Sequence, residues 1–291
     1  MKCNLCPRRC NAERTENKNI GGFCKMPSTI KIARAALHFG EEPCISGKNG
    51  SGTVFFSGCS LGCVYCQNAV ISAQGFGERV SDVRLAEIFQ ELEEIGAHNI
   101  NLVTPTHYID AIISALQIYK PNIPIVYNSS GYETQEAIKL LSDYIDIFLL
   151  DFKYISSEKA YRYSNAANYP VIAQKAIKTA CDIKGEPTFK NGIMQSGVII
   201  RHLLLPASTN DAIKIFDWVR GNTPNAFLSL MSQYIPLFKA ESFKEINRKI
   251  TKREYDKVLN YIIESGFENC YFQDLSSATK QEIPDFDLKG V

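Results

Sequence analysis

Short apolar runs alternate with amphipathic segments from residue 53 onward, and this alternation constrains the fold more than any other feature of the sequence. The apolar runs that we interpret as strands cover residues 53–56, 100–103, 124–127, 146–150, 198–205, 227–231 and 270–273. The segments with helical periodicity cover residues 83–95, 108–119, 134–141, 169–180, 211–220 and 252–265. Continuous apolar strands separated by helices are typical of a parallel sheet with both faces covered. The sequence therefore predicts an α/β fold of six strand–helix units, two fewer than a full barrel contains.

The length and composition suit one such domain with additional structure at its ends. The chain has 291 residues, of which 45% are hydrophobic and 22% charged, and its net charge is +1. This balance favours neither nucleic acid nor a membrane as a partner. The locally basic stretch 239–257 also carries acidic residues, so we interpret it as a solvated helical face. We expect an irregular cysteine-rich module with a connecting loop at 1–50, the strand–helix domain at 51–235, and a closing helix–strand extension at 236–291.

The cysteines are unevenly distributed along the chain. Eight of the ten lie within the first 66 residues. The N-terminus has no apolar signal core, and the sequence has no run of 18 apolar residues, so we expect a cytoplasmic protein. Because the cytosol keeps thiols reduced, cysteines crowded in this way indicate metal binding rather than disulfides.

Four of these cysteines, Cys3, Cys6, Cys10 and Cys24, form a first group. Four thiolates suit a structural zinc ion or an auxiliary iron–sulfur cluster, and the spacing leaves both open. A module this short needs a bound metal to fold, since it buries little apolar surface. Cys44 is a further candidate ligand for either cysteine group, whereas Cys181 and Cys270 are expected to be ordinary buried thiols.

A second group, Cys59, Cys63 and Cys66, directly follows the first predicted strand. Catalytic residues gather at the carboxyl ends of parallel strands, so the loop is in a suitable place for chemistry. Gly58 and Gly62 let its backbone fold closely around an inorganic cluster. Three thiolates would leave one iron of a four-iron cluster free for a ligand. The alternatives are a zinc site with a distant fourth ligand and an electron-transfer cluster completed by another cysteine.

The run Cys59-Ser-Leu-Gly-Cys63-Val-Tyr65-Cys66 resembles the signature of the radical S-adenosylmethionine (SAM) superfamily. The extended form, from Gly58 to Asn68, resembles the branch of the pyruvate formate-lyase activating enzymes. The segments Asn4-Leu5-Cys6-Pro7 and Gly40-Glu41-Glu42-Pro43-Cys44-Ile45-Ser46-Gly47 are similar to those of uncharacterised activating-enzyme-like iron–sulfur proteins.

This resemblance implies a partial (β/α)6 barrel and a [4Fe–4S] cluster on Cys59, Cys63 and Cys66. The open iron would chelate the amino and carboxylate groups of SAM. An electron passing through the cluster would cleave SAM to methionine and a 5′-deoxyadenosyl radical, which abstracts hydrogen from a substrate. The implied partners are a low-potential electron donor, such as flavodoxin or ferredoxin, and as substrate a glycyl radical enzyme, another peptide or a small molecule.

The resemblance also implies where SAM is bound. Activating enzymes carry Gly-Gly-Glu after the second strand, where this chain has Thr104, Thr106 and His107 as substitutes; the same stretch also suits a helix-entry turn. The remaining candidate contacts are Tyr65, Asn128, Ser130, Asp151, Lys153, Arg201 and Gln233. Asp151 and Lys153 are two residues apart on a strand, so they should point to the same side. Arg201 would face the SAM carboxylate, and His202 should point outward in a structural role.

Two classes of function follow from these observations. The first is a radical SAM enzyme, an oxidoreductase that resembles glycyl-radical activases. The second is a non-catalytic metal-binding protein, either a zinc-ribbon module or a ferredoxin-like electron carrier. An enzyme would release 5′-deoxyadenosine on reduction, whereas a carrier would bind iron and leave SAM intact.

Overall fold

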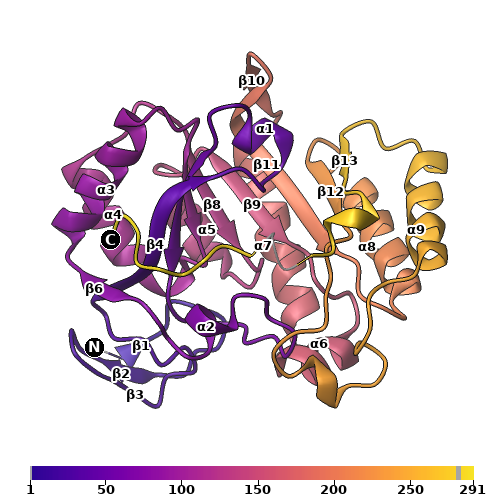
Figure 1. The fold of residues 1–291 in the computed structure, drawn as a ribbon, viewed down its shortest axis with the longest axis horizontal. Helices are drawn as coiled ribbons and strands as arrows, with labels where there is room; N and C mark the ends of the chain where they lie inside the picture. The colour runs from indigo at the N-terminus through magenta and orange to yellow at the C-terminus, as the bar shows by residue number, and fades with distance from the viewer. Residues whose placement is uncertain (1, 280–282) are drawn as a thin grey trace.

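The computed structural model describes residues 2–279 and 283–291, and one large twisted sheet organises them (Figure 1). Its strands follow the order β13-β12-β11-β9-β8-β7-β5-β4-β6, with β10 paired to β11. They are β4 (Ile30–His38), β5 (Ser51–Phe56), β6 (Glu78–Val80), β7 (Ile100–Val103), β8 (Ile125–Ser129), β9 (Ile147–Asp151), β10 (Thr188–Lys190), β11 (Ile193–Leu203), β12 (Phe227–Met231) and β13 (Cys270–Phe272). Within the described residues this path does not close on itself, which makes the fold a partial barrel.

The parallel part of the sheet, as the sequence pattern predicted, consists of β5, β7, β8, β9, β11, β12 and β13. Helices connect them and cover the outer side of the sheet in Figure 1. The longer ones are α3 (Asp82–Glu94), α4 (Ile109–Ile118), α5 (Gln135–Leu141), α7 (Tyr169–Lys184), α8 (Thr209–Asn222) and α9 (Lys252–Glu264); α1 (Pro43–Ser46), α2 (Ala69–Ser72) and α6 (Ser157–Ser164) are short. The α/β class and the partial barrel are therefore confirmed.

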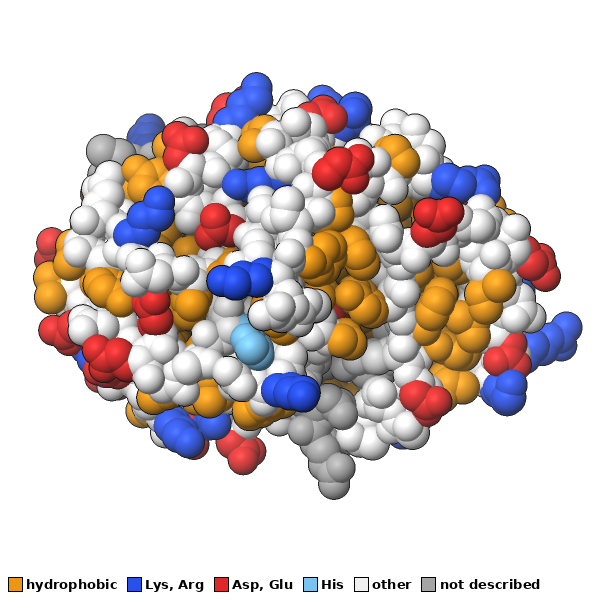
Figure 2. All heavy atoms as spheres, turned by 90° about the horizontal axis from the view of Figure 1, so that it is seen from above, with side chains coloured by type: hydrophobic (Ala, Val, Ile, Leu, Met, Phe, Trp, Pro, Cys, Tyr) orange, Lys and Arg blue, Asp and Glu red, His pale blue; other side chains and the backbone are white. Residues whose placement is uncertain are grey.

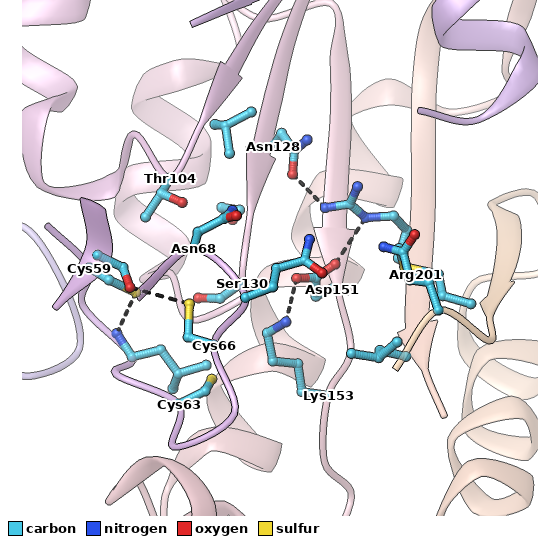
Figure 3. Close-up of a pocket in the computed structure, with 18 of the residues that line it drawn as sticks. Cys59, Cys63, Cys66, Asn68, Thr104, Asn128, Ser130, Asp151, Lys153 and Arg201 are labelled. Atoms are coloured by element: carbon cyan, nitrogen blue, oxygen red, sulfur yellow. Dashed lines mark hydrogen bonds and ion pairs between the residues drawn. The ribbon is translucent and has the colours of Figure 1, made fainter. Parts of the chain in front are cut away.

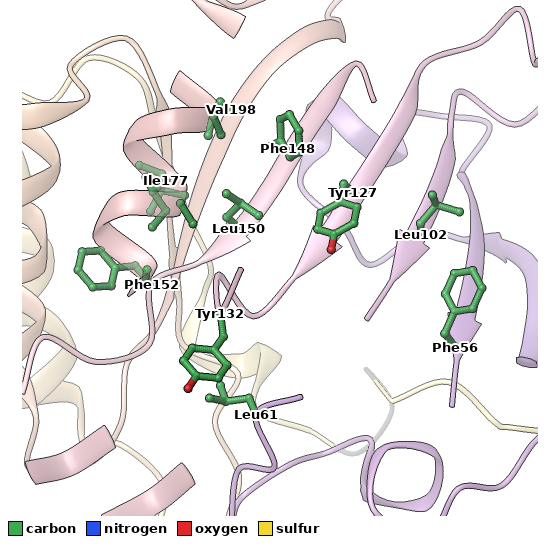
Figure 4. Close-up of a cluster of buried hydrophobic side chains, with 14 of the residues drawn as sticks. Phe56, Leu61, Leu102, Tyr127, Tyr132, Phe148, Leu150, Phe152, Ile177 and Val198 are labelled. Atoms are coloured by element: carbon green, nitrogen blue, oxygen red, sulfur yellow. The ribbon is translucent and has the colours of Figure 1, made fainter. Parts of the chain in front are cut away.

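The main hydrophobic core lies between the sheet and its helices. Side chains at alternate strand positions, such as Leu102, Tyr127 and Leu150, belong to one buried cluster with helix residues such as Ile177 of α7 (Figure 4). The intervening positions face the inside of the barrel. A second apolar cluster that includes Val126, Ile147 and Leu149 fills part of that interior. Because strand side chains alternate, each strand supplies one core face and one site face.

The N-terminal 50 residues are more regular than we expected. A small sheet of β1 (Lys2–Cys3), β2 (Ala12–Arg14) and β3 (Asn19–Ile20) forms the cysteine-rich end. The nine-residue strand β4 then joins the large sheet, antiparallel to β5. The expectation of an irregular segment is therefore wrong for Ile30–His38. A register shift between Ile32 and Arg34 breaks the alternation of side chains along this strand, so its sequence pattern does not indicate a strand.

The C-terminal residues 283–291 form an extended strap that crosses the open side of the sheet and ends near α3 and α4 (Figure 1). The strap is held along β4 by two backbone hydrogen bonds, Leu288 N to Ala33 O at 3.0 Å and Ala35 N to Lys289 O at 2.8 Å. Phe286 packs edge-on against Phe55, with ring centroids 5.6 Å apart. The C-terminal end of the described chain thus lies along β4.

None of the helices in residues 2–279 and 283–291 combines the length and apolar character that crossing a bilayer requires. The charged side chains on the face in Figure 2 are of both signs and interspersed, which fits a net charge of +1.

Candidate active site

The loop that follows β5 brings Cys59, Cys63 and Cys66 together at one end of a cavity (Figure 3). Gly58 and Gly62 have positive φ angles of 87° and 71°, which glycine adopts without a steric penalty. The backbone of Gly58 is fixed because its N–H donates to Ile71 O at 2.9 Å. The loop therefore holds its shape before any cofactor is considered.

Each of the three sulfur atoms has a polar neighbour. The N–H of Leu61 donates to Cys59 Sγ at 3.3 Å, and the hydroxyl of Ser164 donates to Cys63 Sγ at 3.2 Å. Cys66 Sγ lies 3.2 Å from the Ser72 hydroxyl. Hydrogen bonds of this kind help to set the reduction potential of sulfur-ligated clusters. The donor set thus fits an iron–sulfur cluster held by three thiolates.

Two thiols of this loop, those of Cys59 and Cys66, are expensive to ionise without a cation. Burial raises the pKa of Cys59 to about 12, and the charges of Cys63 and Cys66 add to the effect. Burial and Cys63 also raise the pKa of Cys66. Metal ligation requires thiolates, so cluster binding must release protons and would relieve this repulsion. All ten cysteines are free thiols, and none of these three is committed to a disulfide.

A cavity of about 190 Å³ extends from the three thiols into the barrel. Its lining includes these predicted contacts: Tyr65, Thr104, Asn128, Ser130, Asp151, Lys153, Arg201 and Gln233. They come from the ends of successive strands or from the loops after them, so the parallel sheet gathers them on one side. The cavity offers donors and acceptors for a polar ligand the size of a nucleoside next to the sulfur atoms.

Arg201 is the centre of a hydrogen-bond network at the inner wall of this cavity. Its Nε donates to Asp151 Oδ1 at 2.9 Å, and its Nη1 donates to Glu41 Oε2 at 3.0 Å. Its Nη2 donates to Asn128 Oδ1 at 2.5 Å. Glu41 in turn accepts from the amides of Asn101 and Asn128, at 2.9 and 3.1 Å. Arg201 was expected to face the SAM carboxylate, and here protein groups already engage three of its donors.

Asp151 also pairs with Lys153, whose Nζ lies 2.7 Å from Asp151 Oδ2. The two side chains therefore point to the same side, as the spacing predicted. Burial alone would raise the pKa of Asp151, but Lys153 and Arg201 outweigh it and hold that pKa below its usual value. Burial would lower the pKa of Lys153, and the Asp151 carboxylate raises it instead. Both groups are therefore charged, and each compensates the other.

Glu41 and Glu42 reach this network from the turn after β4, and reasoning from the sequence did not assign them to the site. Glu41 lines the cavity, and Glu42 is fully enclosed. Burial raises the pKa of Glu42 despite the opposing charge of Arg201. The Gly-Glu-Glu-Pro segment was noticed only as part of the resemblance. A pair of acidic residues in a turn gave no sign that they enter the barrel.

Thr104, Thr106 and His107 follow β7 but separate in space. Thr104 lines the cavity and has a positive φ of 60°, which is unusual for a β-branched residue. Thr106 instead donates to the buried Glu133 Oε1 at 2.8 Å. His107 is buried and bonds the Ser57 carbonyl through Nε2 at 2.6 Å. Neither Thr106 nor His107 lines the cavity, so their predicted SAM contact is not supported by their placement.

Tyr65 belongs to an aromatic cluster in which its ring contacts those of Tyr154, Tyr163 and Tyr234. Its hydroxyl accepts from the Tyr154 hydroxyl at 2.7 Å, and Tyr154 Oη is 2.8 Å from Ser164 Oγ. Ser164 is the donor to Cys63, so the cluster connects to the cysteine loop. His202 points away from the cavity and its Nδ1 bonds the Phe152 carbonyl at 2.7 Å, in agreement with the structural role predicted for it.

The four N-terminal cysteines lie close enough to influence one another. Burial raises the pKa of Cys6 to about 12, with smaller contributions from Cys24 and Cys3. Burial also raises the pKa of Cys24, to which Cys3 and Cys10 contribute. No three His, Cys, Asp or Glu side chains among the described residues are placed to hold a single metal ion. A second metal site therefore stays a prediction.

Comparison with known proteins identifies the family. The model of the Radical SAM superfamily matches residues 53–218, which contain the three-cysteine loop and most of the parallel sheet. The chain belongs to the radical SAM superfamily. Radical SAM proteins use a [4Fe–4S] cluster and SAM, and the thiols and polar cavity described above fit both groups. The chain is also 34% identical over 266 residues to the uncharacterised protein MJ0674 of Methanocaldococcus jannaschii, with 88% of this chain and 73% of that protein covered.

Solved structures of Streptococcus suis SuiB share the fold. Streptococcus suis SuiB bound to precursor peptide SuiA superposes with a TM-score of 0.54 at 15% identity, covering 76% of this chain and 48% of that one. SuiB bound to S-adenosylmethionine gives 0.54 at 14% identity, with 77% and 50% covered. This radical SAM chain thus spans about half the length of SuiB, and the likeness concerns the fold alone.

Proposed function

We propose that this radical SAM enzyme binds its [4Fe–4S] cluster through Cys59, Cys63 and Cys66 and abstracts hydrogen from a peptide or protein segment. The observation that carries the proposal is the single cavity that joins the three thiols to the Arg201 network. When bound, the cluster and SAM supply one-electron cleavage of the sulfonium, which gives methionine and a hydrogen-abstracting 5′-deoxyadenosyl radical. A carrier or zinc ribbon would have no use for a polar cavity beside its metal.

The chain's own residues would bind, orient and enclose the reactants. Tyr65 and the aromatic cluster behind it exclude water from one side of the thiols. Lys153 and Arg201, both neutralised by acidic partners, leave spare N–H donors toward the cavity for the carboxylate and ribose oxygens of SAM. The one electron has to come from outside, and we propose a low-potential flavodoxin or ferredoxin as its source.

A polypeptide substrate is favoured by the way the C-terminal strap lies at the cavity mouth. Pro284 is part of the cavity lining, and residues 288 and 289 pair with β4 through backbone hydrogen bonds. One extended segment of this chain already lies at the mouth, which supports an extended substrate segment, either a glycyl loop of a partner enzyme or another peptide. We also propose a second metal centre, zinc or iron–sulfur, at Cys3, Cys6, Cys10 and Cys24.

Anaerobic reconstitution with iron and sulfide tests this function. We expect a reduced-cluster EPR signal that shifts when SAM is added, and release of 5′-deoxyadenosine and methionine after reduction. Cys63→Ala should lose the shifted signal and the products, whereas Cys181→Ala, in α7 away from the site, should retain both. Cys24→Ala should lose the metal of the N-terminal site. Iron bound without SAM cleavage, or zinc in the loop, would contradict the proposal.

Deuterium transfer identifies the class of substrate. The reduced enzyme is incubated with SAM and either a digest of deuterium-labelled protein, intact labelled protein, or a labelled small-metabolite extract. We expect deuterium in 5′-deoxyadenosine from the digest or the intact protein. Transfer from the metabolite extract alone would show that the substrate is a small molecule.

A further inference from the structure

Arg8, between Cys6 and Cys10 of the N-terminal module, reaches into the cysteine loop that follows β5. Its Nε donates to Ser60 O at 2.8 Å, and its Nη2 donates to Leu61 O at 2.8 Å. Ser60 and Leu61 are the residues directly after Cys59, in the interval that ends at Cys63. The side chain therefore fixes the backbone between two of the three thiols.

The same guanidinium also reaches the end of α6. Its Nη2 donates to Ser164 O at 2.8 Å, and its Nη1 donates to Asn165 O at 2.5 Å. Ser164 is the residue whose hydroxyl donates to Cys63 Sγ. One arginine thus ties together the two backbone segments that contact the sulfur atoms. A fork of five donors can satisfy four carbonyls at once, which the single ammonium of lysine cannot do in this geometry.

The module also shapes the loop by direct packing. The Phe23 ring covers the Arg8 guanidinium, whose Cζ lies 3.8 Å from the ring centroid. A Cβ added at Gly62 would lie 3.0 Å from the same ring. Met26 packs so closely on Gly58 that a Cβ there would lie 2.2 Å from Met26 Cγ. Phe23 and Met26 flank Cys24 on either side. Side chains near Cys24 therefore pack against both glycines that let the loop turn.

We propose that Arg8 is a positioning residue for the radical SAM cluster, holding the Cys59–Cys63 backbone and the Ser164 donor in register for cluster and SAM binding. The inference rests on the proposed function, because it concerns the same cluster. Arg8 itself touches no sulfur and acts through the carbonyls that it binds. The N-terminal module is then a brace for the active-site loop, and the metal proposed for that module would act on the loop through Arg8 and Phe23.

The test compares Arg8→Gln with Arg9→Gln in the full chain after anaerobic reconstitution. Arg9 is an exposed neighbour whose side chain makes no hydrogen bond or ion pair within the described part of the chain. We expect Arg8→Gln to lower the SAM-shifted EPR signal and 5′-deoxyadenosine formation by about tenfold or more, since several charge-assisted bonds are lost. Arg8→Lys should recover little of this, because it keeps the charge and not the fork.

The outcomes separate this inference from the function on which it rests. If the wild-type protein shows no SAM-induced shift, the proposed function fails. If the wild type shows it and Arg8→Gln matches Arg9→Gln in signal and midpoint potential, the positioning role is wrong. Far-UV circular dichroism checks that Arg8→Gln folds. If Arg8→Gln does not fold, Phe23→Leu replaces it, because it loosens the packing on Arg8 and leaves the Arg8 hydrogen bonds intact. We expect Phe23→Leu to lower the SAM-shifted EPR signal by a smaller amount. An unchanged signal in that variant would overturn the inference.

Discussion

The buried charged side chains at the cavity are neutralised by neighbouring side chains of opposite charge, without a ligand. Arg201 has partners in Glu41 and Asp151, and Lys153 shares Asp151. A buried charge that loses its partner costs several kcal/mol, so such a network is held together tightly. SAM would add its carboxylate to a group of side chains that is already balanced. The network therefore defines the shape of the cavity as well as its charge.

His202 gives a prediction about pH that depends on one residue. Burial lowers its pKa to about 4, from an ordinary value of 6.5. Between these values the unfolded chain binds a proton that the folded protein does not. Stability should therefore fall as the pH drops from about 6.5 to about 4, by up to about 3 kcal/mol for this group.

Urea unfolding of His202→Gln at pH 7.5 and pH 5 measures that contribution. We expect the variant to lose less stability on acidification than the wild type does. His98→Gln, at a half-buried position, serves as the comparison. His107, also buried, continues to titrate in both variants, so some slope should remain. An unchanged slope in His202→Gln would show that this imidazole does not contribute.

Helices and strands show which parts of the fold local sequence determines. The strands β7 to β9 were predictable because every residue in them except Asp151 is buried. Burial on both faces gives these strands short apolar runs, which indicate strands in the sequence. β4 was missed because its register shift breaks the alternation. The loop thiols were predictable because their spacing is local. Glu41 and Arg8 were not, because their contacts lie 160 residues away at Arg201 and 52 residues away at Ser60.

Helix α9 offers a prediction about its first turn. Thr251 accepts from the Glu254 N–H at 3.2 Å, and Glu254 Oε2 accepts from the Thr251 N–H at 2.8 Å, a reciprocal capping box. Thr251→Ala removes one half of this box and should lower the free energy of unfolding by about 1 kcal/mol. Thr251→Ser keeps the hydroxyl and should stay near the wild type. Equal losses of unfolding free energy in Thr251→Ala and Thr251→Ser, measured by denaturant unfolding, would show that the Thr251 hydroxyl does not stabilise the helix.

At the scale of the whole molecule, the partial barrel is completed by segments from outside its strand–helix units. The N-terminal module braces the cysteine loop, and the strap at 283–291 lies across the open side. Phe286 joins an apolar cluster that includes Ala33, Phe55 and Val103, inside the mouth. Among the described residues neither segment has a hydrophobic cluster of its own, so each depends on the barrel for its structure.

The contribution of the strap can be measured with one substitution. Phe286→Ala should lower the free energy of unfolding by about 2 kcal/mol, less than for a fully enclosed ring because Phe286 is only half-buried. It should also make the strap more accessible to protease. Asp285→Ala is the control, since only the backbone carbonyl of Asp285 is used, by Arg34. Protection equal to wild type in Phe286→Ala would show that the ring does not anchor the strap.

The strap's attachment to β4 has a consequence for the order of events during synthesis. β4 is made early, and residues 283–291 are made last among the described residues. The strap therefore cannot pair with β4 until the ribosome has translated everything in between. We therefore expect the three thiols to be easier to reach for cluster insertion before residues 283–291 pair with β4 than afterwards.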